Sequence, residues 1–340
     1  MTRPVALDAM GGDKAPGEIV AGARRAHEEH GVPVLLVGPD DGSLGDTGGL
    51  EVASASEVIA MDEEPGRAVR TKKDASLVRA AEAVRDGRAS AMVSAGNTGA
   101  TMASALLRMG RLPGVARPAI AAPLPTPGRG GQPTMLVDAG ANAECRAEWM
   151  VQFAQMASAY VTRRYGTVSP TTALLSIGEE PSKGSPLAKE AHGLLADAPG
   201  IRFVGNVEGR DLLDGRVDVV VTDGFTGNVA LKALEGAMAA FLRILGAAFG
   251  SSPEAKAASE VLLPSLLAHA EEVDPETTGG ALLLGVDGVC VISHGSSSAR
   301  AIANALRVAH ELAEADLVGD LRRAIAAAGA PTSVAAPSAS

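Results

Sequence analysis

Six short polar loops that contain glycine each follow an apolar run and precede a segment with helical periodicity. Glycine lets the backbone approach a bound phosphate closely, while Asn, Ser and Thr can cap the next helix or donate to an oxygen. In an open α/β sheet the carboxyl ends of parallel strands line one crevice, into which helix N-termini direct unpaired N–H groups. The loops therefore predict a crevice at one edge of a sheet that binds a phosphate-like anion. They span residues 8–13, 94–99, 138–142, 176–180, 223–228 and 293–296.

Reactive side chains lie in or beside these loops. His294 follows an apolar run and precedes Gly295 and three serines, so we expect it at the rim of the crevice, where it either transfers a proton or braces the loop. Lys183 precedes a helical segment, where a lysine either neutralises a phosphate or oxyanion or has a surface role. Three aspartates end apolar runs and either orient a ligand or, more commonly, brace their own turn. They are Asp8, Asp138 and Asp223.

Several familiar catalytic patterns are absent from the sequence. Residues 10–14 lack the spacing of the dinucleotide-binding glycine motif, and residues 178–185 have Lys and Gly in the reverse order to a P-loop. No Gly-x-Ser-x-Gly motif occurs, and His27 and His30 lie on a charged helix end without a clear third ligand. We therefore expect no covalent intermediate, no metal and no nucleotide cofactor.

The composition is that of an acidic, globular chain. Its 340 residues are 46% hydrophobic and carry a net charge of −10, and aromatic residues make up 2%. Such a surface favours neither counterion release nor base stacking, so we do not expect nucleic-acid binding. No uninterrupted run of 18 apolar residues and no leader pattern occur, so we expect a cytosolic protein that does not span a membrane. Cys145 and Cys290 lack metal-type spacing, and we expect both to be core residues.

Strand-like and helix-like segments alternate along the chain. Most of the apolar runs lack period-2 alternation, which is typical of strands covered on both faces, so we predict an α/β fold with a mainly parallel sheet. We expect one α/β domain over residues 1–330 and a disordered tail over residues 331–340. The predicted strands cover residues 4–8, 33–37, 50–54, 91–94, 119–123, 135–138, 172–177, 201–205, 217–222 and 289–293, and the predicted helices cover residues 16–30, 75–86, 98–109, 146–165, 185–195, 227–249 and 296–313.

Residues 227–273 predict a helical hairpin. One helical stripe of Leu, Met and Phe is followed by a turn at residues 250–253 and by a second apolar cluster that Pro264 interrupts. Ordinary core packing is the commoner explanation for such a stripe. A contact with a partner or a membrane surface is the alternative.

Five motifs, taken together in chain order, closely resemble the bacterial phosphate acyltransferases, which make acyl phosphate from acyl-acyl-carrier-protein in phospholipid synthesis. The motifs are LDAMGGD at 7–13, VSAGNTGA at 93–100, VDAGAN at 137–142, TDGFTGN at 222–228 and ISHGSS at 292–297. The resemblance runs from about residue 4 to about residue 315. Two positions depart from the family pattern: Lys14 stands where an aromatic residue or His is more frequent, and Leu282 stands where Pro is found.

The resemblance implies a three-layer α/β/α fold of the isocitrate/isopropylmalate-dehydrogenase type with a protruding helical hairpin. It also implies a homodimer, no metal, and an acyl phosphate product that passes to a membrane glycerol-3-phosphate acyltransferase for phosphatidic acid synthesis. The hairpin at residues 245–270 is then a candidate contact with the membrane or a partner. Lys256 is the only lysine or arginine in this segment, so apolar insertion would dominate over attraction to anionic lipid.

For this reaction the sequence suggests direct attack of phosphate on the thioester carbonyl. We expect Asn228, Lys183 and the N–H of Ser296 to stabilise the oxyanion, and His294, oriented by Asp223, to protonate the departing thiolate. The catalytic candidates are therefore His294, Lys183, Asn228 and Asp223, and the substrate-binding candidates are Asp8, Gly11, Gly12, Asn97, Thr98, Gly99, Asn142, Gly227, Gly295 and Ser296.

The acyl carrier protein is acidic, so we expect it to dock on a local basic surface. The densest basic cluster is Arg67, Arg70, Lys72 and Lys73, for which a solvated face is an equally good explanation. Three rival functions remain at this stage. They are a phosphotransacetylase acting on short acyl-coenzyme A, a decarboxylating dehydrogenase of similar fold, and a non-catalytic protein that binds phosphate metabolites.

Overall fold

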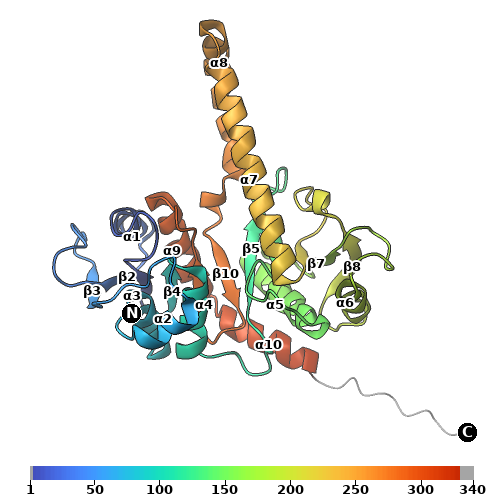
Figure 1. Cartoon of the computed structure of the whole chain (residues 1–340), viewed down its shortest axis with the longest axis horizontal. Coiled ribbons are helices and arrows are strands. Elements are labelled where there is room, and N and C mark those ends of the chain that lie inside the picture. Colours follow the sequence, from blue (N-terminus) through green and yellow to red (C-terminus); the bar gives the residue numbers. More distant parts are fainter. Residues whose placement is uncertain (1–2, 330–340) are drawn as a thin grey trace, which may run out of the picture.

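An open sheet with helices on both faces forms the body of the molecule, and a helical hairpin rises from it (Figure 1). The computed structural model describes residues 3–329. The sheet has 11 strands in the order β3-β2-β1-β4-β11-β10-β5-β6-β9-β7-β8. This architecture confirms the predicted α/β fold with a mainly parallel sheet and a protruding hairpin.

Two groups of parallel strands make up most of the sheet, and they run in opposite directions. The first group consists of β3 (Glu51–Ser54), β2 (Val34–Gly38), β1 (Val5–Asp8), β4 (Ala91–Ser94) and β11 (Val289–Ile292). The second group consists of β6 (Thr134–Val137), β9 (Val219–Val221), β7 (Thr171–Leu175) and β8 (Arg202–Val207). Between them, β10 (Ala281–Leu284) is antiparallel to β11 and to β5 (Ala119–Leu124), and β5 is antiparallel to β6.

The reversal shows that one part of the sequence prediction is wrong, because the six glycine loops do not share one edge of the sheet. The carboxyl ends of β1, β4 and β11 point one way, and those of β6, β7 and β9 point the other way. β6 nevertheless ends beside the middle of the sheet, since Val137 pairs with Ala121 of β5. Loops from both groups can therefore meet over the face of the central strands β5 and β10.

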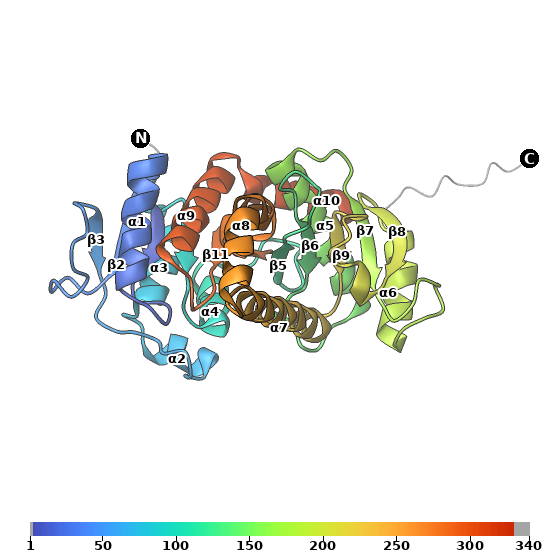
Figure 2. The ribbon, with the colours of Figure 1, turned by 90° about the horizontal axis from the view of Figure 1, so that it is seen from above.

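Helices cover both faces of the sheet because successive side chains of its buried strands point to opposite sides. In β1, Val5 and Leu7 belong to one hydrophobic core and Ala6 to the other. The first core lies under α1 (Gly17–His30), α5 (Ala147–Tyr165), α6 (Pro186–Ala196), α9 (Ala299–Glu314) and α10 (Leu317–Gly329). The second lies under α2 (Pro65–Thr71), α3 (Ser76–Arg85), α4 (Thr98–Arg108) and the base of the hairpin (Figure 2). Short 3₁₀ turns occur at Gly209–Asp211 and Pro275–Thr277.

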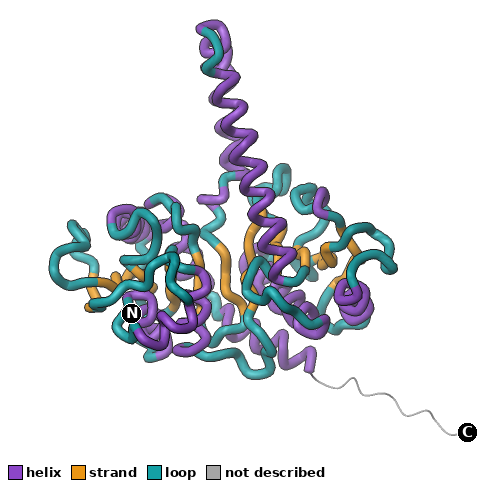
Figure 3. Tube along the Cα trace, in the orientation of Figure 1, coloured by secondary structure: helices purple, strands orange, loops and turns teal. Residues whose placement is uncertain are grey.

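The hairpin consists of α7 (Gly224–Phe249) and α8 (Pro253–Val273), in agreement with the prediction for residues 227–273. Its outer part stands clear of the sheet and its covering helices (Figure 3). Leu231 and Leu234 of the base pack against the core, whereas the outer turns carry exposed apolar side chains. Core packing therefore explains only the base. None of the described helices is long and apolar enough to cross a membrane. The predicted tail at residues 331–340 lies outside the described residues.

Candidate active site

A cavity of about 480 Å³ lies between α7 and the sheet face formed by the central strands. β5 and β10 contribute Ile120, Ala122 and Ala281 to its floor. Four of the six glycine loops also contribute to its lining, through Thr98, Ala139, Asn228 and, in the last loop, Ser293, His294 and Ser296 but not Gly295. The inner face of α7 closes the cavity with Asn228, Leu231, Lys232, Leu234, Glu235 and Met238. The structure thus brings most of the predicted loops together over the face of the sheet.

His294 lies in the cavity wall, as expected from its position after an apolar run. Its Nδ1 is 2.8 Å from Ser296 Oγ, and the Ser296 N–H donates to the same nitrogen at 3.3 Å. The Nε2 atom lies 3.4 Å from Lys232 Nζ on α7. The ring therefore has one nitrogen engaged by its own loop and the other directed at α7, where it can meet a substrate group.

The start of α7 places Asn228 at the cavity. Gly227 packs so closely on the turn after β6 that a Cβ atom added to it would lie 1.9 Å from the Asp138 carbonyl oxygen. Only glycine permits this approach. Asp223 caps the helix by accepting from Thr226 N at 2.9 Å and from Thr226 Oγ1 at 2.7 Å. Asp223 therefore positions α7, and the contacts of His294 described above do not include it.

Asp138 and Asn142 brace the turn after β6. Asp138 is fully buried, and its carboxylate accepts from the N–H groups of Ile120 and Ala141. The Asn142 side chain donates to Asp138 Oδ2 and to the Pro118 carbonyl oxygen, both at 2.8 Å. Asn142 does not line the cavity, and these two acceptors already occupy its amide. Asp138 therefore braces its own turn, which is the more common of the two roles considered for it in the sequence analysis.

The first glycine loop supports the His294 loop from outside the cavity. The Asp13 N–H donates to the Gly295 carbonyl oxygen at 2.8 Å. Gly12 has a φ of 115°, and a Cβ atom there would lie 3.1 Å from the same oxygen. Gly11 leaves no room for a side chain either, since a Cβ atom would lie 2.4 Å from Asp8 Oδ2. These glycines are needed for loop packing and do not line the cavity.

Asp8 is a buried carboxyl between the first two glycine loops. It accepts from Ser76 Oγ at 2.6 Å and from Ser94 Oγ at 2.7 Å. Burial raises the pKa of Asp8, and the hydrogen bonds from the two serines offset part of that rise. These hydrogen bonds connect β1 with β4 and α3. Asp8 therefore supports the loops that flank the cavity.

The loop that starts α4 combines a cap with a cavity residue. Asn97 caps α4, and its Nδ2 donates to the carbonyl oxygens of Met61 and Glu63 at 2.9 and 3.2 Å. Thr98, the first residue of α4, lines the cavity. A Cβ atom on Gly99 would lie 2.7 Å from Pro65 Cγ, so α2 packs closely on the start of α4. The N-terminus of α4 is thereby fixed at the cavity, where its leading N–H groups favour an anion.

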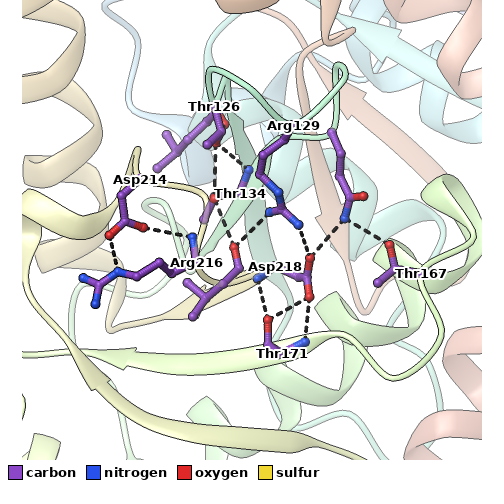
Figure 4. Close-up of polar contacts among 11 residues, drawn as sticks. Thr126, Arg129, Thr134, Thr167, Thr171, Asp214, Arg216 and Asp218 are labelled. Carbon is purple, nitrogen blue, oxygen red and sulfur yellow. Dashed lines mark hydrogen bonds and ion pairs between the residues drawn. The ribbon is translucent and has the colours of Figure 1, made fainter.

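One side of the cavity is apolar. It is formed by Leu124, Pro125, Leu213 and Leu234. The chain that follows Pro125 is anchored by Arg129, which donates to Asp218 Oδ1 at 2.5 Å and to the Val217 carbonyl oxygen at 3.1 Å (Figure 4). Asp218 in turn accepts from the N–H and the hydroxyl of Thr171, both at 2.8 Å. This network ties the apolar wall to the second strand group.

Two groups of predicted residues lie away from the cavity lining. Lys183 is an exposed residue of the loop between β7 and α6, and it does not line the cavity. The basic cluster lies on and just after α2, where Arg67, Arg70 and Lys73 are exposed. Lys72 is engaged with Glu63 at 2.6 Å and is not free for a partner in this arrangement.

Lys232, Glu235 and Leu213 line the cavity, although none of them belongs to a predicted loop. Lys232 and Glu235 follow Asn228 at spacings of four and seven residues, which places all three on one helix face. Extending the TDGFTGN motif by two helical turns would have found both residues. Leu213 carries no comparable local signal.

Both cysteines are unsuited to nucleophilic chemistry. Burial raises the pKa of Cys290 to about 12 and, together with the nearby carboxylates, raises the pKa of Cys145 to about 12. A thiol with such a pKa stays protonated at neutral pH. Cys290 is buried in the core as predicted, whereas Cys145 is half-buried. Among the side chains that the structure describes, which leave out those of residues 267–273, no group of three or more from His, Cys, Asp or Glu is placed to hold a metal ion.

A protein-family model described as "Fatty acid synthesis protein" matches residues 4–319. The chain is 48% identical to the phosphate acyltransferase of Heliobacterium modesticaldum over 329 residues, which cover 94% of this chain and 97% of that protein. It is 49% identical to the phosphate acyltransferase of Myxococcus xanthus over 340 residues, which cover 96% of this chain and 95% of that protein.

Solved structures with the same fold are more distant in sequence. A phosphotransacetylase from Streptococcus pyogenes superposes with a TM-score of 0.58 at 17% identity, covering 92% of this chain and 94% of that one. A 4-hydroxythreonine-4-phosphate dehydrogenase from Klebsiella pneumoniae gives a TM-score of 0.54 at 12% identity, covering 92% and 100%. At these identities the likeness concerns the fold alone.

Proposed function

Because the chain belongs to the phosphate acyltransferase family, we propose that it transfers a fatty acyl group from acyl-acyl-carrier-protein to inorganic phosphate. The observation that carries the proposal is a single cavity with a polar wall suited to an anion and an apolar wall suited to an acyl chain. Neither wall alone would select this reaction. The product is an acyl phosphate, which a membrane glycerol-3-phosphate acyltransferase would consume in phosphatidic acid synthesis.

In this proposal phosphate lies against the start of α4 and the inner face of α7. A phosphate oxygen attacks the thioester carbonyl carbon, the C–S bond breaks, and the thiolate leaves with a proton from His294 or water. Asn228 would donate to the tetrahedral oxyanion, where one donor can stabilise the transition state by about 3 kcal/mol. The Ser296 N–H, which the sequence also suggested, donates to His294 Nδ1 instead. Lys183 does not line the cavity, and its contact with the oxyanion stays a prediction from the sequence. Neither cofactor nor metal enters these steps.

The acyl chain would lie on the cavity floor beneath α7 and extend to the apolar wall at Leu124. Ile120, Ala122 and Leu124 alternate along β5 and face the cavity together. At about 3.3 Å per residue they span roughly 13 Å, a length suited to an extended aliphatic chain and much longer than an acetyl group needs. This length favours a long-chain donor over the short acyl-coenzyme A of a phosphotransacetylase. A non-catalytic metabolite-binding protein would not need such a wall.

The carrier protein would dock beside α2. Arg67, Arg70 and Lys73 are exposed there, and α2 packs on the start of α4, whose Thr98 lines the cavity. We expect charge reversal at Arg70 and Lys73 to raise KM for the carrier-bound thioester by about tenfold, with little effect on a small thioester. Steady-state kinetics with both donors check this, and an equal effect on both would place the docking face elsewhere.

We further propose a homodimer that works in the cytosol and attaches reversibly to the membrane through residues 245–270. The support is the row of exposed apolar side chains on the outer hairpin, which nothing in the described chain covers. A membrane-attached enzyme would release acyl phosphate close to the acyltransferase that consumes it.

The decisive experiment is a phosphate-dependent assay of acyl phosphate formation. The purified enzyme is given carrier-protein and coenzyme A thioesters of increasing chain length, with and without phosphate. We expect the highest kcat/KM for long-chain acyl-carrier-protein and no product without phosphate. Preference for acetyl-coenzyme A would support the phosphotransacetylase alternative, and phosphate binding without turnover on any thioester would support a binding protein.

A further inference from the structure

Lys232 is a charged cavity residue that lies outside every predicted loop. It follows Asn228 by one helical turn, and its Nζ lies 3.4 Å from His294 Nε2 and 2.8 Å from Glu235 Oε2. Among the described residues that line the cavity, it is the only lysine or arginine. Asn228, Lys232 and His294 therefore surround the same part of the cavity with groups that can donate to an anion.

We propose that Lys232 binds the acyl-accepting phosphate and that Glu235 holds the Lys232 side chain in place while the cavity is empty. The inference rests on the proposed function, since it names the residue that would hold one substrate of that reaction. The phosphate would accept hydrogen bonds from the Lys232 ammonium and from one N–H of the Asn228 amide, which leaves the other amide N–H for the oxyanion and His294 for the thiolate. No covalent bond forms between Lys232 and the substrate.

The charge of the cavity makes Lys232 decisive for anion binding. Glu235 and Glu276 place two carboxylates in the lining, and Glu276 Oε2 accepts from Ser298 Oγ at 2.8 Å. The positive groups that oppose these carboxylates are Lys232 and the helix N-termini. Each helix N-terminus carries only about half a unit of positive charge. Without Lys232 the described lining would have carboxylates and no full positive charge, and a phosphate dianion would be repelled.

The weak contact between Lys232 and Glu235 allows Lys232 to exchange Glu235 for phosphate. The two side chains are 51% and 43% exposed, and exposed ion pairs at this spacing are weak. A phosphate dianion carries more negative charge than the Glu235 carboxylate, and it can accept from Lys232 and Asn228 at the same time. Phosphate can therefore displace Glu235, whose carboxylate then returns to solvent.

The test measures phosphate binding directly and in turnover. We expect Lys232→Met to raise KM for phosphate about tenfold or more with a smaller change in KM for the thioester, and Lys232→Arg to restore most of the affinity. Calorimetric titration of inorganic phosphate without thioester should show the same loss. Lys189→Met removes an exposed lysine from α6, and we expect it to behave as wild type in both measurements.

A second variant probes the exchange. Glu235→Gln removes the competing carboxylate, so we expect KM for phosphate to fall roughly threefold. Wild-type phosphate affinity in Lys232→Met would overturn the role of Lys232, and an unchanged or raised KM in Glu235→Gln would overturn the exchange. A wild-type enzyme that binds phosphate but forms no acyl phosphate would instead overturn the proposed function, so the failures are distinguishable.

Discussion

The inner and outer parts of α7 belong to one continuous helix but meet different surroundings. From Asn228 to Met238 the helix lines the cavity and contributes both polar and apolar side chains to it. Beyond this stretch Phe241 and Ile244 are 60% and 68% exposed. The amphipathic pattern continues past the point at which the sheet can cover it.

This contrast separates two uses of apolar residues that look alike in the sequence. The inner leucines Leu231 and Leu234 are half-buried because strands lie beneath them. The outer ones face solvent in the described chain, and an exposed apolar row of this kind marks a surface for a partner or a membrane. The inner helix should therefore control chemistry, and the outer helix should control attachment.

The largest effect is expected at the inner helix. Asn228→Ala removes a donor from the cavity and should lower kcat about 100-fold, because an oxyanion donor acts mainly in the transition state. Since Asn228 is exposed, the unfolding temperature should change little. Phe241→Ala on the outer helix is the matched control and should keep wild-type turnover in solution. Similar rates for Asn228→Ala and wild type would remove Asn228 from the mechanism.

The sequence predicted the loops and the α/β class well because both depend on local signals. The glycine loops end most strands within about two residues of the observed ends, and Gly31 stops α1 in the left-handed conformation expected of a helix end. His294 and Thr98 line the cavity because each directly follows or starts a predicted element.

The sequence could not predict the direction of the strands. The short run Ala281–Leu284 is absent from the predicted strands, and nothing in Ala119–Leu124 distinguishes a parallel from an antiparallel partner. These two strands reverse the sheet, so they decide which loops meet. The same non-local pairing leaves Lys183 outside the cavity lining and places Leu213 in it.

A second prediction concerns the outer hairpin. Val261→Ser combined with Leu262→Ser should weaken binding to lipid vesicles at least tenfold, because both side chains are exposed and burying one large apolar side chain contributes about 1.5–3 kcal/mol. Turnover of a water-soluble thioester should stay within about twofold of wild type. Vesicle co-sedimentation and light scattering together distinguish a membrane contact from a contact between two copies. If vesicle binding and mass both stay unchanged, the outer row has neither role.

The smallest expected effect concerns the N-terminal caps of the two hairpin helices, one at the base and one at the turn. Asp223 caps α7 beside the cavity, and Ser252 caps α8 at the hairpin turn, where it accepts from Ala255 N at 3.1 Å. Replacing either by Ala should cost about 1 kcal/mol of local helix stability. Only Asp223→Ala should also lower kcat several-fold, because it loosens the turn that carries Asn228. Thermal unfolding and steady-state kinetics of both variants check this. Equal loss of turnover in the two would mean that the hairpin acts as one rigid unit and that the inner and outer parts of α7 are not independent.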